Sequence, residues 1–222
     1  MQESGPYYRD RAEAGQALAE LLLGRAGRDN LVLAVPNGGV AVAAPIAQAL
    51  AAPLRLLVVR KIQFPHNTEA GFGAVAADGS AVVDRALTQH LGLSPAVVQA
   101  QTQAALASVQ ARLAVYGPWA RLPRLAGREL ILVDDGLASG STMEAAIAIV
   151  RAQGPARVTV AAPTASARAA ARLSPLADEL VVPHVGRGPV FAVASAYARW
   201  YDVGDAEVLA MLERLNPDGA AS

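Results

Sequence analysis

The sequence predicts an α/β fold with a doubly wound, mostly parallel sheet. Short apolar runs without charge alternate with stretches of helical spacing, which is the pattern of a parallel sheet covered on both faces. Two of these runs lead directly into a small-residue loop and then a helix. The chain has 222 residues, 53% hydrophobic and 17% charged, so it can bury a full core. We expect one domain over residues 1–222, with a core at about 9–183 and a C-terminal hood or tail at about 184–215.

The first part of the chain predicts two strand–helix units. Leucine and alanine at helical spacing indicate an opening amphipathic helix, and apolar runs bounded by glycine or proline indicate strands. The predicted elements are a helix at 9–24, a strand at 31–35, a helix at 40–51 and a strand at 54–59.

The remainder continues this alternation after an insertion. Two short apolar segments at 74–77 and 81–84, separated by Asp78-Gly79, predict a hairpin. Ser94-Pro95 is a good helix start, and Gly117-Pro118 is a good stop. The predicted elements are a long helix at 94–116, strands at 130–133, 157–162 and 180–183, and helices at 143–153 and 165–173.

The segment at 129–143, ELILVDDGLASGSTM, is the most informative part of the chain. Asp134 and Asp135 follow a buried strand directly, at the sheet edge where open α/β folds bind ligands. The small residues 136–142 then lead into a helix, whose free N–H groups favour an anion such as phosphate. The two carboxylates need a different partner, either sugar hydroxyls or a divalent cation. A phosphorylated sugar satisfies both halves.

A second loop of the same kind follows the first strand. Asn37, Gly38 and Gly39 connect that strand to a helix, and two such corners in one sheet can face one ligand at a switch point. Arg60 and Lys61, expected at the end of the second strand, can neutralise an anion there. The simpler alternatives are a tight turn that needs glycine and a solvated basic pair.

The run LILVDDGLASGSTM resembles the phosphoribosyl pyrophosphate (PRPP) motif of type I phosphoribosyltransferases, with Ser139 where threonine is usual. The chain is most similar to the bacterial group of predicted phosphoribosyltransferases. The resemblance implies that Asp134 and Asp135 hold the ribose hydroxyls. It also implies that the terminal phosphate lies on Ala138, Ser139, Gly140, Ser141 and Thr142.

The resemblance extends these roles to the rest of the site. It makes Asn37, Gly38 and Gly39 a pyrophosphate loop, with Asn37 where a basic residue is common. It implies that Arg60 and Lys61 hold the departing pyrophosphate, and that Mg²⁺ binds through the substrate rather than through dedicated ligands.

Two further segments gain expected roles from the same resemblance. Residues 63–73, with His66, Thr68 and Glu69, are a candidate lid. A small hood from the chain ends covers the acceptor in the family, and here it would include Phe191, Tyr197, Trp200 and Tyr201. Ala138 stands where 6-oxopurine enzymes usually have an acid, which disfavours hypoxanthine and guanine as acceptors.

The expected function is transfer of the phosphoribosyl group from Mg–PRPP to a nitrogenous acceptor, with release of pyrophosphate. Asp134, Asp135, Arg60 and Lys61 are the expected catalytic residues. Two alternatives stay open: a PRPP-binding regulator without turnover, and a metal-dependent phosphohydrolase that uses the paired acids.

Composition excludes several other classes. Lys plus Arg and Asp plus Glu both number 19, which argues against binding of nucleic acid or anionic membrane as the main activity. The chain has no cysteine, and its three histidines lack metal-ligand spacing. Residues 30–54 carry no charge, but prolines interrupt them, so a membrane span is not expected. We expect a soluble cytoplasmic protein. Type I relatives are often dimers, so the resemblance allows a homodimer as one oligomeric state.

Overall fold

The centre of the protein is a five-stranded parallel sheet. The computed structural model describes residues 6–25, 28–188 and 190–215. The strand order is β2-β1-β6-β7-β9, and every neighbouring pair is parallel. This confirms the predicted α/β fold. The strands are β1 (Asn30–Ala34), β2 (Leu54–Leu56), β6 (Glu129–Val133), β7 (Arg157–Ala161) and β9 (Glu179–Val181).

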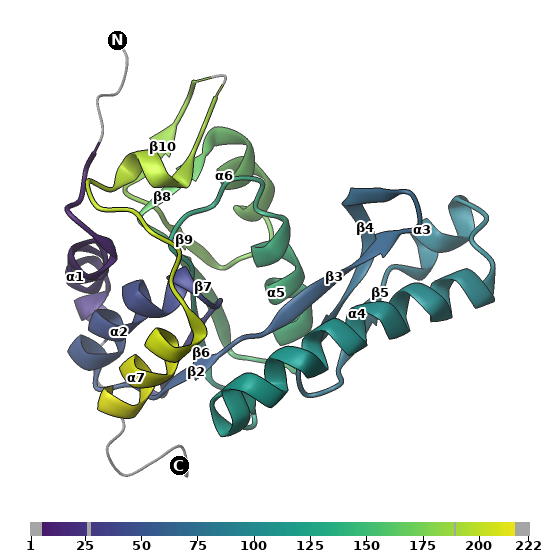
Figure 1. Cartoon of the computed structure of the whole chain (residues 1–222), viewed down its shortest axis with the longest axis horizontal. Coiled ribbons are helices and arrows are strands. Elements are labelled where there is room, and N and C mark those ends of the chain that lie inside the picture. The colour runs from purple at the N-terminus through teal and green to yellow at the C-terminus, as the bar shows by residue number, and fades with distance from the viewer. Residues whose placement is uncertain (1–5, 26–27, 189, 216–222) are drawn as a thin grey trace.

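Helices cover both faces of this sheet because successive strand residues point to opposite sides. Val32 and Ile131 belong to one buried cluster, which contains residues of α1 (Arg11–Leu22), α2 (Gly38–Leu50) and α7 (Asp205–Leu215). Their neighbours Leu33 and Leu132 belong to the opposite cluster, with α5 (Ser141–Arg151) and α6 (Ala167–Leu173). The sheet is therefore doubly wound, and Figure 1 shows α2 and α5 on its two sides.

The order of the strands places a switch point between β1 and β6. From β1 the chain runs outward to β2, and from β6 it runs the other way to β7 and β9. Ala34 lies opposite Val133, and the Val35 N–H donates to the Val133 carbonyl at 2.9 Å. Both strands thus end side by side, and both following corners leave the same edge of the sheet. Ligands bind at such a point in open α/β sheets.

A second unit extends from the core between β2 and β6, and we call residues 59–116 the flap. It contains an antiparallel sheet of β3 (Val59–Phe64), β4 (Asn67–Ala76) and β5 (Ala81–Val83), followed by α3 (Arg85–His90) and α4 (Pro95–Tyr116). Figure 1 shows it reaching away from the parallel sheet. The predicted hairpin and long helix lie in it, and α3 was not predicted.

Two predicted boundaries in this region were wrong. The expected strand 54–59 ends at Leu56, since Leu57 and Val58 carry the chain out of the parallel sheet and Val59 begins β3. Leu57 and Val58 are buried, so the apolar run gave no sign of the break. Residues 63–73, expected to form an irregular loop, belong mostly to the β3–β4 hairpin, with register shifts beside Gln63.

The N-terminal segment pairs with a segment that precedes α7. Tyr8 forms a parallel bridge with Tyr197, and the N–H groups of Tyr7 and Tyr8 both donate to the Ala196 carbonyl at 3.0 Å. We call residues 193–203 the roof strap. A small parallel pair of strands, β8 (Thr164–Ser166) and β10 (His184–Gly186), precedes the roof strap.

The described residues also contain the 3₁₀ turns η1 (Leu23–Arg25), η2 (Gly117–Ala120) and η3 (Val193–Ala196). No helix within residues 6–25, 28–188 and 190–215 has the length and apolar character to cross a membrane.

Candidate functional site

The loop at residues 138–142 presents free backbone donors at the start of α5. Gly140 precedes the helix with φ at 74°, a conformation that favours glycine, and no side chain caps the helix. The first helical hydrogen bond, from Glu144 N–H to the Gly140 carbonyl, leaves the preceding N–H groups without helical partners. The Thr142 side chain is exposed beside them. This loop has the geometry of an anion site.

Neighbouring elements hold the loop in shape. The Ser166 hydroxyl donates to the Ala138 carbonyl at 2.6 Å, and Arg172 donates to the Ser139 carbonyl at 3.3 Å. Within the loop, the Ser139 and Ser141 hydroxyl oxygens lie 2.9 Å apart. The loop is thus fixed largely through its carbonyls. Its Ser141 N–H donates to the Ser139 hydroxyl at 3.3 Å, so the remaining N–H groups of the loop are the ones that can face an anion.

The acid pair at the end of β6 is asymmetric. Asp134 is half-buried and accepts a hydrogen bond from the Asp135 N–H at 2.9 Å. Burial, followed by the negative charge of Asp135, raises the pKa of Asp134 well above its usual range. Asp135 instead forms an ion pair with Arg11, whose Nε lies 2.8 Å from Asp135 Oδ2. The described residues contain no cluster of three metal-binding side chains, so a hard cation here would rely on the acid pair and the ligand.

The β1–α2 corner packs directly against these acids. A Cβ at Gly38 would lie 1.8 Å from Asp135 Oδ2, and one at Gly39 would lie 2.8 Å from the Val133 carbonyl. Only glycine therefore allows this approach. The two predicted corners meet as expected, with the backbone of one against the carboxylates of the other.

The side chain of Asn37 has a structural role instead of facing a ligand. Its Nδ2 donates to the Val203 carbonyl and to Asp205, both at 2.8 Å. The Tyr116 hydroxyl lies 2.7 Å from both Asn37 Oδ1 and Asp205 Oδ1. Asn37 thus joins α2, α4 and α7. As a member of a pyrophosphate loop it could offer only its backbone.

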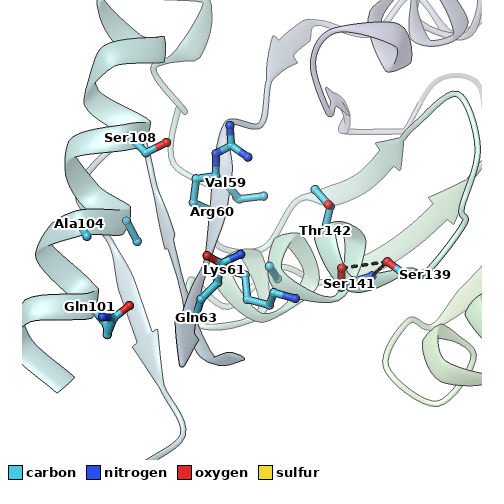
Figure 2. Close-up of a pocket in the computed structure, with 12 residues that line it drawn as sticks. Val59, Arg60, Lys61, Gln63, Gln101, Ala104, Ser108, Ser139, Ser141 and Thr142 are labelled. Atoms are coloured by element: carbon cyan, nitrogen blue, oxygen red, sulfur yellow. Dashed lines mark hydrogen bonds between the residues drawn. The ribbon is translucent and has the colours of Figure 1, made fainter. Parts of the chain in front are cut away.

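Two connected cavities line the switch point. The first, of about 520 Å³, contains the acid pair, Asn37, Gly38, Arg11 and Trp200. The second, of about 490 Å³, contains Lys61, Ser139 and Ser141. Val59, Arg60 and Thr142 line both, so the site is continuous. Figure 2 shows Arg60 and Lys61 between helix α4 and the loop that carries Ser139, Ser141 and Thr142.

The two basic residues reach the site from an unexpected element. Arg60 and Lys61 lie inside β3 of the flap and do not end a strand of the parallel sheet, contrary to the sequence prediction. Arg60 is exposed and forms no ion pair within the described part of the chain. A flap strand that presents cations to a core loop can close a site around an anion.

This arrangement agrees with comparisons to known proteins. A family model described as the phosphoribosyl transferase domain matches residues 9–186. The chain belongs to the phosphoribosyl transferase family. Two Mycobacterium tuberculosis proteins, MT0597 of strain CDC 1551 and Rv0571c of strain H37Rv, are each 36% identical over 211 residues, and their names assign them provisionally to this family. The match covers 95% of this chain but 47% of each relative, so this chain spans about half their length.

A solved structure shows the same fold over nearly the whole chain. The protein TT1426 from Thermus thermophilus is 33% identical, with a TM-score of 0.86. The alignment covers 97% of this chain and 99% of TT1426. The fold shared with TT1426 therefore extends beyond the parallel sheet to the flap and into the roof strap.

Sequence reasoning located most of the site but missed several of its members. The structure brings together the acid pair, the loop at 138–142, Gly38, Gly39, Arg60 and Lys61. Arg11 and Arg112 were missed, because they lie on amphipathic helices where arginine is ordinary. His66 is exposed at the hairpin turn, and the side chains of Thr68 and Glu69 lie outside the described residues. The lid role stays a prediction.

Proposed function

We propose that this protein binds Mg–PRPP at the switch point and transfers its phosphoribosyl group to a nitrogenous acceptor. The observation that carries the proposal is the continuous cavity that joins an anion-binding helix start, an acid pair and a basic flap strand. In this reading the terminal phosphate lies on residues 138–142. The ribose hydroxyls face the acid pair, and the pyrophosphate lies near Arg60, Lys61 and the backbone of Gly38 and Gly39.

The residues present fit a hard divalent cation bound with the substrate. Asp134 offers a carboxylate that no arginine or lysine neutralises in an ion pair within the described chain. Mg²⁺ prefers such oxygen ligands together with phosphate oxygens and water. When bound, it would supply neutralisation of the pyrophosphate charge. Asp134 is the protein group we expect beside it.

The reaction forms one bond and breaks another at the anomeric carbon. The acceptor nitrogen bonds to that carbon, the bond to the pyrophosphate oxygen breaks, and a proton leaves the nitrogen. Positive charge develops on the ribose, and the nearby carboxylates stabilise it. Arg60 and Lys61 stabilise the charge on the leaving group. Loss of one such preorganised contact typically costs about 3 kcal/mol, or about two decades in rate.

A PRPP-binding regulator is the second candidate, and Asn37 favours it. The corner that would hold pyrophosphate has no cation of its own, since the Asn37 side chain is committed to Val203, Asp205 and Tyr116. Binding without turnover would follow if Arg60 and Lys61 do not compensate. The third alternative, a phosphohydrolase, would act without any acceptor.

The test is pyrophosphate release from Mg–PRPP in the presence of a panel of purine, pyrimidine and pyridine bases. We expect release that depends on one class of base and is lost in Asp134→Asn/Asp135→Asn. PRPP binding with no release for any base would favour the regulator. Release of inorganic phosphate without a base would favour the phosphohydrolase and contradict the transferase.

A further inference from the structure

Arg11 joins three parts of the protein that lie far apart in the sequence. It stands in the first turn of α1, and its Nε donates to Asp135 at the end of β6. Its Nη1 donates to the Tyr201 carbonyl at 2.9 Å, and its guanidinium carbon lies 3.9 Å from the centre of the Trp200 ring. The Arg11 side chain is only 7% exposed. These contacts fix the position of the guanidinium.

Asp135 is tied to the same roof strap by other contacts. The Tyr197 hydroxyl donates to the Asp135 carbonyl at 2.5 Å, and burial together with the Asp135 charge raises the pKa of Tyr197, which keeps its proton in place. The next residue, Gly136, lies so close to Val193 that a Cβ would meet Val193 Cγ1 at 2.4 Å. The strap is thus held to Asp135 in two ways. Arg11 links the strap to the Asp135 side chain, and Tyr197 and Val193 contact the backbone at Asp135 and Gly136.

Asp134 differs from Asp135 in each of these respects. No arginine or lysine in the described chain forms an ion pair with it, and no residue of the strap donates to it. Both carboxylates line the same cavity. A ligand hydroxyl or a cation would compete with a mostly buried guanidinium for Asp135 Oδ2, and separating such a pair is costly. It would meet no such competitor at Asp134.

We propose that Asp135, besides its place in the ligand site, pairs with Arg11 to fasten the roof strap over the cavity, a task that Asp134 does not share. This inference does not depend on the identity of the ligand. Arg11 and Asp135 are positioning residues in this account. Their effect is to hold Trp200, which lines the cavity, at the side of the acid pair.

Trp200 is a direct reporter of the fastener, by which we mean the contact of Arg11 with Asp135 and the roof strap. The chain contains two tryptophans, so the signal of Trp200 can be separated from that of Trp119. Protein labelled with 5-fluorotryptophan should give separate ¹⁹F resonances for Trp200, which is 39% exposed, and Trp119, which is 6% exposed. Substitution of each tryptophan by phenylalanine assigns the signals. Trp119 lies in η2, where its ring faces Arg55 and not Arg11, and it serves as the internal control for folding.

The variants to compare are Asp134→Asn, Asp135→Asn, Arg11→Gln and, as a matched control, Arg9→Gln. Arg9 is two residues away, is 64% exposed and pairs only with Asp10 in the described structure. Each is measured by ¹⁹F NMR and by calorimetric titration with Mg–PRPP. Arg11→Lys, which keeps the charge but loses the planar group, serves if Arg11→Gln does not fold.

We expect Asp134→Asn to weaken Mg–PRPP binding by about tenfold or more and to leave the Trp200 resonance in place. We expect Asp135→Asn and Arg11→Gln to shift or broaden the Trp200 resonance and to leave the Trp119 resonance in place. Arg9→Gln should change neither.

Two results would overturn the inference. One is a Trp200 resonance that shifts as much in Asp134→Asn as in Asp135→Asn. The other is a Trp200 resonance that stays unchanged in both Arg11→Gln and Asp135→Asn. If wild-type protein binds no PRPP, the proposed function fails, whereas the Trp200 resonance still decides whether the fastener exists.

Discussion

The two strand–loop–helix corners at the switch point look alike in sequence and do different work in the structure. The β6–α5 corner turns carboxylates and free N–H groups toward the cavity. The β1–α2 corner turns glycine backbone toward those carboxylates and uses its polar side chain, Asn37, to join three helices. The β6–α5 corner supplies the groups that can contact a ligand, and the β1–α2 corner holds those groups in position.

This difference shows why a small-residue loop is an ambiguous signal. Gly38 is needed because Asp135 occupies the space that a Cβ would fill, whereas Gly140 is needed for its positive φ before α5. A substitution in the first corner should therefore act on the site through packing. A substitution in the second should act on the ligand directly.

Gly38→Ala should have the largest effect on stability. The added methyl would lie 1.8 Å from Asp135 Oδ2, so the acid or the loop must move. We expect a loss of about 3 kcal/mol or more in the free energy of unfolding and weaker Mg–PRPP binding. Urea unfolding and calorimetry measure both.

Gly24→Ala is the control for Gly38→Ala. Nothing lies within 4 Å of a Cβ at Gly24, and its φ is not positive. We expect a change within about 0.5 kcal/mol. Equal stability losses in the two variants would contradict the idea that the first corner depends on close packing.

Asn37→Ala should lower the free energy of unfolding and leave Mg–PRPP binding nearly unchanged. It removes donors to Val203 and Asp205 and an acceptor for Tyr116, so we expect a loss of about 1–3 kcal/mol in the free energy of unfolding. Mg–PRPP affinity should change less than about threefold, because the neighbouring backbone groups remain. Gln153→Ala, an exposed amide with one long contact to Asp78, is the control. A selective loss of affinity in Asn37→Ala would instead make Asn37 a ligand residue.

Asp134→Asn should give the smallest effect on stability, a gain that depends on pH. The folded-state pKa of Asp134 is raised by burial and by Asp135, so between its unfolded and folded pKa values the folded protein holds more protons. Asp134 therefore costs stability increasingly as pH rises through that window. The variant should melt at a higher temperature than wild type at about pH 8 and lose this advantage near pH 4, the unfolded aspartate range. Glu213→Gln, exposed on α7, should show no such gain.

The sequence sufficed for the parallel sheet and for the β6–α5 corner, because those features are local. Leu130 to Val133 is an apolar run, and the residues after it combine acids, glycine and hydroxyls in one continuous segment. The strand bounds and the start of α5 follow from that pattern within a few residues. The match to the family model, over residues 9–186, includes this segment.

The positioning contacts could not be predicted, because their partners are distant in sequence. Arg11 and Asp135 are separated by 124 positions, and Asn37 and Asp205 by 168. The start of the flap was misplaced for another reason: Leu57 and Val58 are buried like strand residues although they leave the parallel sheet. Apolar character reports burial and says nothing about which sheet a strand joins.

The most direct test of the central claim is calorimetric titration of PRPP, with and without Mg²⁺, into wild-type protein and into Asp134→Asn/Asp135→Asn. The account predicts saturable binding by the wild type, strengthened by Mg²⁺, and a loss of at least about 100-fold in the double variant. Absence of binding by the wild type under both conditions would contradict it. So would equal affinity in the two proteins.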